Sequence, residues 1–186
     1  DCYLCTPKMP LAVAANTDVS KWLGIGMLSS AGISGGRVIG QEAGVGCTTS
    51  LYCAFLSGAD MICGLGLMNS GTAASLDSLV MCDEIIQMIK QIGQGINTDD
   101  DSLALDVIDA VGPGGEYLTQ DHTFEYWQKW FRPRLIDRSG YEAWQAAGRK
   151  TMKDRIVAER RRILSEYEPA PLDEKLLQEL AAIENP

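Results

Sequence analysis

The sequence has 186 residues, of which 46% are hydrophobic and 22% are charged. This composition is typical of one folded domain, and it excludes disordered and collagen-like chains. The formal net charge of −9 opposes the attraction that draws proteins to nucleic acids and to anionic lipids, so we expect neither partner. The longest uncharged runs, 43–59 and 61–76, contain 17 and 16 residues interrupted by Gly, Ser and Thr. Both are shorter than the roughly 18 apolar residues of a membrane-spanning helix.

The cysteines indicate a reducing compartment. Four of the six lie inside apolar runs, where a free cysteine commonly behaves as a small buried hydrophobe. These four are Cys47, Cys53, Cys63 and Cys82. No signal peptide opens the sequence, and we therefore expect a cytoplasmic protein. Cys2 and Cys5 have the spacing of zinc ligands, but zinc needs about four ligands and no second such pair exists, so no metal site is predicted.

The first half of the chain alternates helical and extended patterns. An amphipathic run predicts a helix over 10–23, and a short apolar run predicts a strand over 25–30. After a Gly-rich loop, small residues predict a helix over 43–57, followed by a second apolar strand over 60–67. Helical spacing of Leu, Val and Ile then predicts a helix over 75–93. Strands alternating with helices at this spacing are typical of parallel βα units.

The second half reads as helices. Asp99–Asp101 can cap a helix that runs to Val111, before a turn at 112–115. The remaining predicted helices span 123–130, 141–167 and 173–183. Two prolines separate the last two of these helices. Charged residues concentrate here, which is typical of solvated helices on the outside of a larger body.

Two strands are too few for an independent parallel sheet. Either the chain forms an oligomer, or further strands belong to another part of the protein. Composition alone does not distinguish these alternatives.

Several segments, in order and at matching spacing, carry a resemblance to a known family. They are 31–34 (AGIS), 56–60 (LSGAD), 71–80 with its SLDSLV, 103–108 (LALDVI), 111–115 (VGPGG), and 135–138 (LIDR) followed by Trp144 and 147–148. Together they run over nearly the whole chain. The chain resembles the C-terminal part of the trimethylamine methyltransferase superfamily, the corrinoid-dependent amine methyltransferases.

The resemblance implies an α/β fold that is the C-terminal part of a (β/α)8 TIM-type barrel followed by C-terminal helices. Residues 1–120 would then hold the last βα units, and residues 121–186 a helical extension packed on the barrel. A complete barrel needs about 250 residues and eight strands, with its active site at the carboxyl ends of the strands. The missing strands would lie in a longer chain.

The resemblance also implies a reaction and a partner. Pyrrolysine-containing members carry that residue in the loop after the strand at 25–30, where this sequence has Ile33. Isoleucine has no imine chemistry, which favours the branch that demethylates quaternary amines such as glycine betaine. The reaction would move a methyl group from the amine to the cobalt of a corrinoid (cobalamin) carried by a separate protein, so this chain would bind no cofactor tightly. The alternative is a non-catalytic fragment or split subunit that completes a barrel with another chain.

Five residues are candidates for substrate binding, whereas the catalytic residues stay unknown. They are Ile33, Glu42, Asn69, Ser70 and His122. A methylammonium group favours aromatic faces and a nearby carboxylate, and Glu42 is the only acid between Asp18 and Asp60.

Each candidate also has a structural reading. Ile33 could be a packed loop residue, Glu42 could cap the following helix, and the Asn69–Ser70 pair is ordinary turn chemistry. His122 could be a capping or packing residue. The sequence also departs from the family at Glu42, Val45 and Gly46, where other members have a Gln and a His-Glu pair, which would imply a different betaine or a loss of catalysis.

Overall fold

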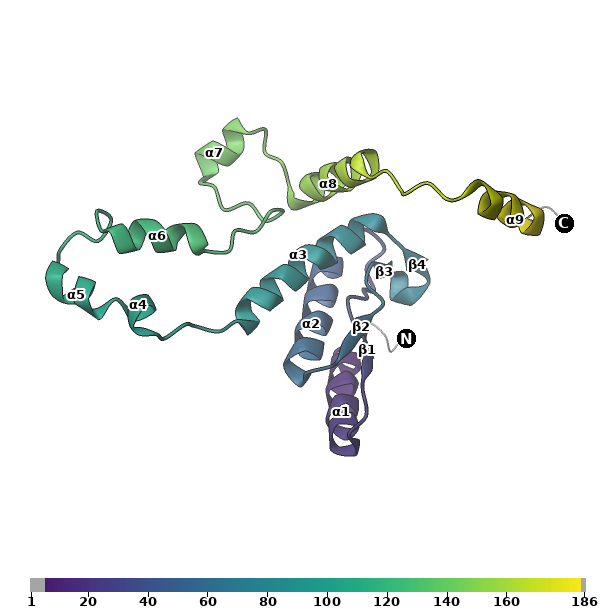
Figure 1. The fold of residues 1–186 in the computed structure, drawn as a ribbon, viewed down its shortest axis with the longest axis horizontal. Helices are drawn as coiled ribbons and strands as arrows, with labels where there is room; N and C mark the ends of the chain where they lie inside the picture. Colours follow the sequence, from purple (N-terminus) through teal and green to yellow (C-terminus); the bar gives the residue numbers. More distant parts are fainter. Residues whose placement is uncertain (1–5, 185–186) are drawn as a thin grey trace.

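The computed structural model describes residues 6–184, so Cys2 and Cys5 lie outside the described residues. The first part of the described chain contains two long βα units and a hairpin (Figure 1). Its elements are α1 (Lys8–Leu23), β1 (Leu28–Ser30), α2 (Gln41–Ser57), β2 (Met61–Cys63), β3 (Leu67–Met68), the 3-10 turn η2 (Asn69–Gly71), β4 (Ala73–Ala74) and α3 (Leu76–Gly93). The predicted helices at 10–23, 43–57 and 75–93 are therefore confirmed.

The predicted parallel pairing is confirmed, but both strands are shorter than expected. Strand β1 pairs in parallel with β2, with Ser29 opposite Ile62. The prediction of one strand over 60–67 was wrong, because Gly64 and Gly66 have φ of +91° and +82° and turn the chain after Cys63. The residues beyond this turn form an antiparallel hairpin of β3 and β4 instead.

The core lies where α1, α2 and α3 pack together beside the strands. Helix α2 presents one small-residue face, with Ala43, Cys47 and Ala54 fully buried, which lets its neighbours approach closely. Helix α3 begins at Ser75, whose side chain accepts a hydrogen bond from the Ser78 amide at 3.3 Å.

The second part of the chain forms shorter helices that extend outwards (Figure 1). They are α4 (Asp100–Leu103), α5 (Leu105–Val111), α6 (Asp121–Lys129), α7 (Tyr141–Ala146), α8 (Met152–Glu166) and α9 (Glu174–Glu184). Asp99 caps α4 as predicted, and its side chain accepts the Ser102 amide at 2.7 Å. The expected single helix through Val111 is wrong, because Ala104 adopts a left-handed conformation between α4 and α5.

The predicted helix over 141–167 is also two helices. Gly148 and Arg149 both have positive φ, and α8 starts afresh at a capping box made by Thr151 and Asp154. Helix α8 packs on α3 through Ile156, which is 1% exposed, and through an ion pair of 2.9 Å from Arg160 Nε to Asp77 Oδ1. Among residues 6–184, no helix is both long and apolar enough to cross a membrane.

Candidate functional site

The carboxyl ends of β1 and β2 meet at one edge, as parallel pairing requires. The loop after β1 is bonded there to the segment after β2 through four backbone hydrogen bonds of 3.0–3.1 Å. They run from Ala31 N to Cys63 O, Ser34 N to Leu67 O, Asn69 N to Gly36 O and Ser70 N to Ser34 O. We call this bonded pair of segments, 31–36 and 63–70, the strand-end platform. Ligands of parallel α/β sheets bind at such edges.

The backbone of the platform depends on glycines. A Cβ at Gly64 would lie 2.9 Å from Ile33 Cδ1, and a Cβ at Gly32 would lie 2.7 Å from Leu65 Cδ2. Both glycines also have positive φ, which other residues rarely adopt. The two segments can therefore approach each other only because these side chains are absent.

Asn69 and Ser70 stand at the outer end of the platform in strained backbone. Their φ angles are 47° and 60°, in the left-handed region that non-glycine residues seldom occupy. The Asn69 side-chain amide donates to Thr72 Oγ1 at 2.7 Å, and that hydroxyl donates to Asn69 O at 2.7 Å. Asn69 is exposed, so this turn presents polar groups beside the strand ends.

Ile33 lies inside the platform rather than on it. Its side chain is 5% exposed and packs against Gly64. It also lines a small hollow of about 130 Å³ beneath the start of α1 and the first turns of α2. The structural reading of Ile33 as a packed loop residue thus fits the described chain.

Glu42 lies beside the platform, in the first turn of α2. It does not cap this helix, because the cap position is Gly40 and no side chain bonds there. Gly36 brings the first turn of α2 close to the platform: its oxygen accepts the Asn69 amide, and a Cβ on it would lie 3.1 Å from the backbone nitrogen of Ala43, the residue after Glu42. The Glu42 carboxylate is exposed and favourably placed at the positive end of the helix dipole.

His122 is not part of the platform. It belongs to α6, which lies far from the strands in Figure 1. Its Nε2 lies 2.7 Å from Asp101 O, and its ring stacks on Tyr126 with centroids 4.2 Å apart. The same Tyr126 hydroxyl donates to the Asp101 carboxylate, which raises the pKa of the tyrosine. These contacts hold α6 to α4, which fits the alternative reading of His122 as a packing residue.

Buried thiols and hydroxyls support the platform from below, and sequence reasoning missed this role. Gly32 O accepts from Cys47 Sγ at 3.3 Å and from Cys82 Sγ at 3.6 Å, while Gly32 N donates to Ser50 Oγ at 3.0 Å. The expectation of buried cysteines is confirmed for Cys47 and Cys82, whereas Cys63 is exposed. Hydrogen bonding to Cys47 lowers the pKa of Cys82 to about 7, against the raising effect of burial.

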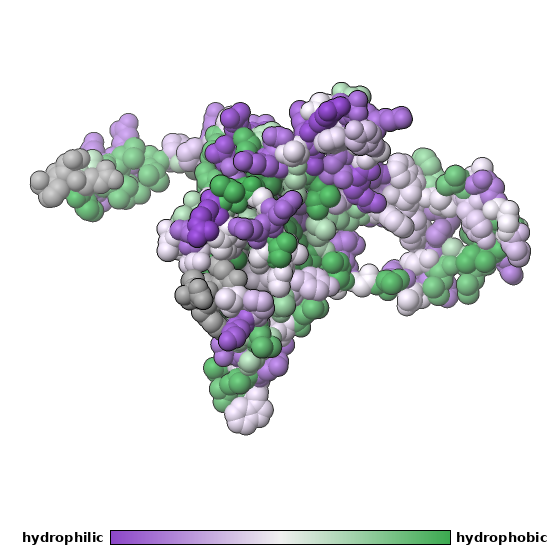
Figure 2. Space-filling model, turned by 180° about the vertical axis from the view of Figure 1, so that it is seen from behind, coloured by the Kyte–Doolittle hydropathy of each residue, from purple (hydrophilic) through white to green (hydrophobic). Residues whose placement is uncertain are grey.

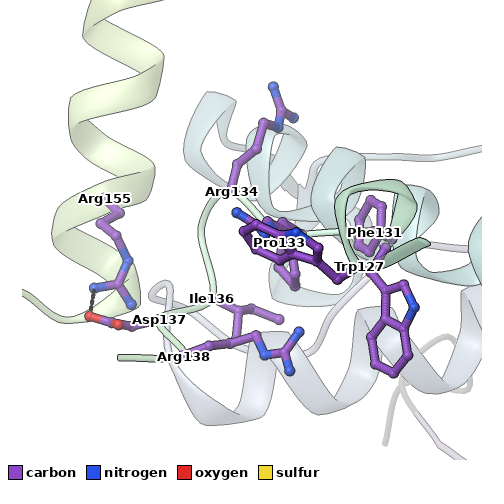
Figure 3. A pocket seen from close by; sticks show the side chains of 10 residues that line it. Trp127, Phe131, Pro133, Arg134, Ile136, Asp137, Arg138 and Arg155 are labelled. Atoms are coloured by element: carbon purple, nitrogen blue, oxygen red, sulfur yellow. Dashed lines mark hydrogen bonds and ion pairs between the residues drawn. The ribbon is translucent and has the colours of Figure 1, made fainter. Parts of the chain in front are cut away.

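A second concave region lies far from the strand ends, between the end of α6 and the start of α8 (Figure 3). This cleft of about 680 Å³ is lined by aromatic and arginine side chains. Arg155 is occupied, because it donates to Leu135 O at 2.7 Å and pairs with Asp137 at 3.4 Å. Arg132 instead lies over the Trp127 ring, with its Cζ 4.5 Å from the ring centroid. We call this region the Trp-Arg cleft.

No cluster of three or more His, Cys, Asp or Glu side chains in the described part of the chain is arranged to hold a metal ion.

Comparison with known proteins gives one consistent result. The family model for trimethylamine methyltransferase (MTTB) matches residues 3–184. The chain belongs to the trimethylamine methyltransferase family.

Individual relatives agree with this assignment. The chain is 30% identical over 178 residues to trimethylamine methyltransferase MttB of Desulfitobacterium hafniense (strain DSM 10664 / DCB-2), which covers 96% of this chain and 36% of the relative. It is 31% identical over 179 residues to a glycine betaine methyltransferase of Desulfitobacterium hafniense (strain Y51), covering 95% and 37%. MttB of Methanosarcina barkeri (strain Fusaro / DSM 804) is 28% identical. The chain thus spans about a third of the length of these family members.

Proposed function

We propose that this chain is the C-terminal part of a methyltransferase that moves a methyl group from a quaternary amine, such as glycine betaine, to the cobalt of a corrinoid protein. The observation that carries the proposal is the strand-end platform. In a member of this family, it brings Asn69 and Ser70 to the edge where parallel α/β folds bind ligands, with Glu42 alongside. Similarity to a glycine betaine methyltransferase supports the same choice.

The platform would belong to a (β/α)8 barrel in the whole protein. Leu28 and Met61 lie opposite each other in the parallel pair, and their side chains are 58% and 66% exposed. Apolar strand residues on a parallel sheet are normally covered on both faces. Further strands and helices of the same barrel would cover them.

The chemistry follows from the charge of the substrate. When the C–N bond of a quaternary ammonium breaks, its electron pair stays on nitrogen and a neutral tertiary amine leaves, so no protein group has to activate the nitrogen. Orientation of the methyl group is then the main task of the pocket. The exposed Glu42 carboxylate would attract the cation, the Asn69–Ser70 turn would limit its position, and the alkyl side chain of Ile33 would stay behind the platform.

The corrinoid would be held by the partner protein, and it supplies the cobalt that accepts the methyl group. This chain's only histidine does not suit a ligand role, because its Nε2 is engaged by Asp101 O and its ring face is covered by Tyr126. Glu42, Asn69 and Ser70 would bind the substrate rather than the corrinoid.

The test uses the full-length protein with reduced cobalamin or the corrinoid protein, and a panel of glycine betaine, carnitine and trimethylamine. We expect methylation of cobalt, seen in its visible absorption spectrum, with at least one quaternary amine. Methylation with trimethylamine alone would contradict the choice of a quaternary amine, and no methylation with any of the three would favour the alternative of a non-catalytic subunit.

A narrower test separates substrate binding by Glu42 from a structural role. We expect Glu42→Gln to raise KM about 10-fold while leaving the melting temperature within about 1 °C, because an exposed charge contributes little stability. Asp18→Asn is the matched control, since Asp18 is an exposed acid on α1. An unchanged KM for Glu42→Gln would remove Glu42 from the site.

A further inference from the structure

The two faces of the β1–β2 pair carry different side chains. On the first face, Ser29 is 1% exposed, and Ile62 opposite it packs against the core that α1, α2 and α3 share. Because side chains alternate along a strand, the flanking residues point to the second face. These residues are Leu28, Ser30, Met61 and Cys63. In a (β/α)8 barrel the helices lie outside the strands, so the second face would be the barrel interior.

The second face changes character along the strands. Its first pair, Leu28 and Met61, is bulky and apolar, like the side chains that fill a barrel interior. Its last pair, Ser30 and Cys63, is small and polar, and Ser30 Oγ lies 3.6 Å from Cys63 Sγ. Small side chains at the carboxyl ends of the strands leave space above a packed interior, where barrel enzymes bind their ligands.

The Ser30–Cys63 pair borders the strand-end platform. Cys63 O accepts the Ala31 amide at 3.0 Å, so the two segments of the platform are bonded to each other directly beyond the pair. Gly64 follows with a φ of +91°, and the turn that it makes leaves the Cys63 side chain exposed. The pair and the platform therefore adjoin at the same edge of the sheet, with Asn69 and Ser70 at the outer end.

Exposure alone does not mark this surface as a ligand site. Hydrophobic side chains reach the surface in several places, including α9 (Figure 2). The chain spans about a third of the length of its relatives, so the rest of the protein would cover many of them. The Ser30–Cys63 pair is distinguished by its small polar side chains and by its position at the carboxyl ends of two parallel strands.

We propose that Ser30 and Cys63 form the inner wall of the substrate pocket and contact the methylated ammonium group of the amine. The inference rests on the proposed function and adds two residues to Glu42, Asn69 and Ser70. The Ser30 oxygen and the polarisable Cys63 sulfur offer lone pairs to methyl groups that carry part of the positive charge. Because both side chains are small, they also set how bulky an ammonium group the pocket admits.

The exposed thiol allows a test that does not depend on catalysis. The full-length protein is alkylated with iodoacetamide, with and without glycine betaine, carnitine or trimethylamine, and the rate at each cysteine is followed by mass spectrometry of its peptide. We expect a quaternary amine at about ten times its dissociation constant to slow alkylation of Cys63 about 10-fold, because the bound ammonium group covers the thiol. Cys53, a half-buried thiol on α2, is the control whose rate should not change. An unchanged rate at Cys63 with every amine, or no reaction of Cys63 in the amine-free protein, would overturn the proposal.

Variants test the size of the wall through binding alone. We expect Cys63→Met to raise the calorimetric dissociation constant of the quaternary amine about 10-fold, because the longer side chain enters the pocket. Cys63→Ser keeps the size and should leave the constant within about 3-fold. Cys53→Met is the matched control, since it adds the same bulk outside the pocket and should leave the constant unchanged. An unchanged constant in Cys63→Met, or an equal rise in Cys53→Met, would contradict the wall.

These measurements separate the wall from the reaction. Methylation of cobalt by an amine that does not protect Cys63 would overturn the wall and leave the proposed function standing. Protection of Cys63 without any methylation of cobalt would support the wall as a binding site and contradict the proposed function.

Discussion

The two parts of this molecule, before and after Gly93, differ in how many of their apolar side chains are buried. Of the 16 buried hydrophobic residues in the part of the chain that the structure describes, 13 lie between Met9 and Ile89, and three, Ala104, Leu135 and Ile156, lie beyond. The first part is built from small residues and glycines that let helices and loops touch. The second part consists of short amphipathic helices whose apolar faces are largely open. The difference teaches that the first part holds most of the buried core of the described chain, whereas the second part leaves most of its apolar side chains exposed.

The largest contrast is expected from truncating a leucine in each part. Leu51 is 1% exposed in the core, and Leu51→Ala should lower the free energy of unfolding by about 3 kcal/mol through the cavity it leaves. Leu118→Ala, in the outlying part, should change it by less than about 0.5 kcal/mol. Urea unfolding of both variants measures these changes in the free energy of unfolding. Similar losses at the two positions would contradict the division of the molecule.

The next contrast separates close packing from backbone conformation. Gly64 and Gly24 both have positive φ, but a Cβ would meet Ile33 only at Gly64 and open space at Gly24. Gly24→Ala should therefore cost about 1 kcal/mol for conformation alone. Gly64→Ala should lower the free energy of unfolding by about 2 to 3 kcal/mol, because Ile33 must also shift. If thermal unfolding gives the same loss of unfolding free energy for both variants, the two segments of the platform can lie farther apart without cost.

The sequence predicts the first part better than the second, for a physical reason. Burial imposes a periodic pattern, so the helix from Ser75 to Gly93 and the parallel strands could be predicted from spacing. The errors fall where backbone conformation decides the structure: Gly64 and Gly66 end β2, and Ala104 and Arg149 interrupt helices whose side-chain pattern continues. The types of the surrounding residues do not reveal where a residue other than glycine adopts the left-handed backbone conformation.

The candidate site shows the same division. Proximity of Ile33, Asn69 and Ser70 follows from parallel strands, whose carboxyl ends share an edge. Placement of His122 on α6 depends on a long path through the outlying helices, which no spacing rule fixes. The support of Gly32 by Cys47 and Cys82 was missed because a thiol in an apolar run looks like any small core residue.

One buried carboxylate joins the two parts. Glu84 on α3 is 1% exposed, its Oε1 accepts the Leu135 amide at 2.9 Å, and its Oε2 lies 3.7 Å from Arg134 Nε. Glu84→Ala would leave the buried Leu135 amide without its acceptor, at a cost of about 2 kcal/mol, whereas Arg134 keeps its hydrogen bond to Asp83. Hydrogen exchange of the Leu135 amide should then accelerate about 10-fold or more.

Glu84→Gln is the matched control, since it keeps an oxygen acceptor while removing the charge. We expect it to retain most of the Leu135 protection. Unchanged exchange in Glu84→Ala would mean that the connection between the two parts does not depend on this carboxylate.

The smallest expected effect concerns Cys82, beneath the platform. Its pKa in the folded protein is lowered from 9.0 to about 7, chiefly by the hydrogen bond with Cys47. An acid with a depressed folded pKa contributes stability above its unfolded pKa and loses it as the pH falls through the folded value. The free energy of unfolding should therefore rise by about 1 kcal/mol between pH 6.5 and 8, and Cys82→Ala should flatten this slope. Cys53→Ala is the control, because Cys53 is a half-buried thiol on α2 outside this network, and a slope that survives Cys82→Ala would assign it to another group.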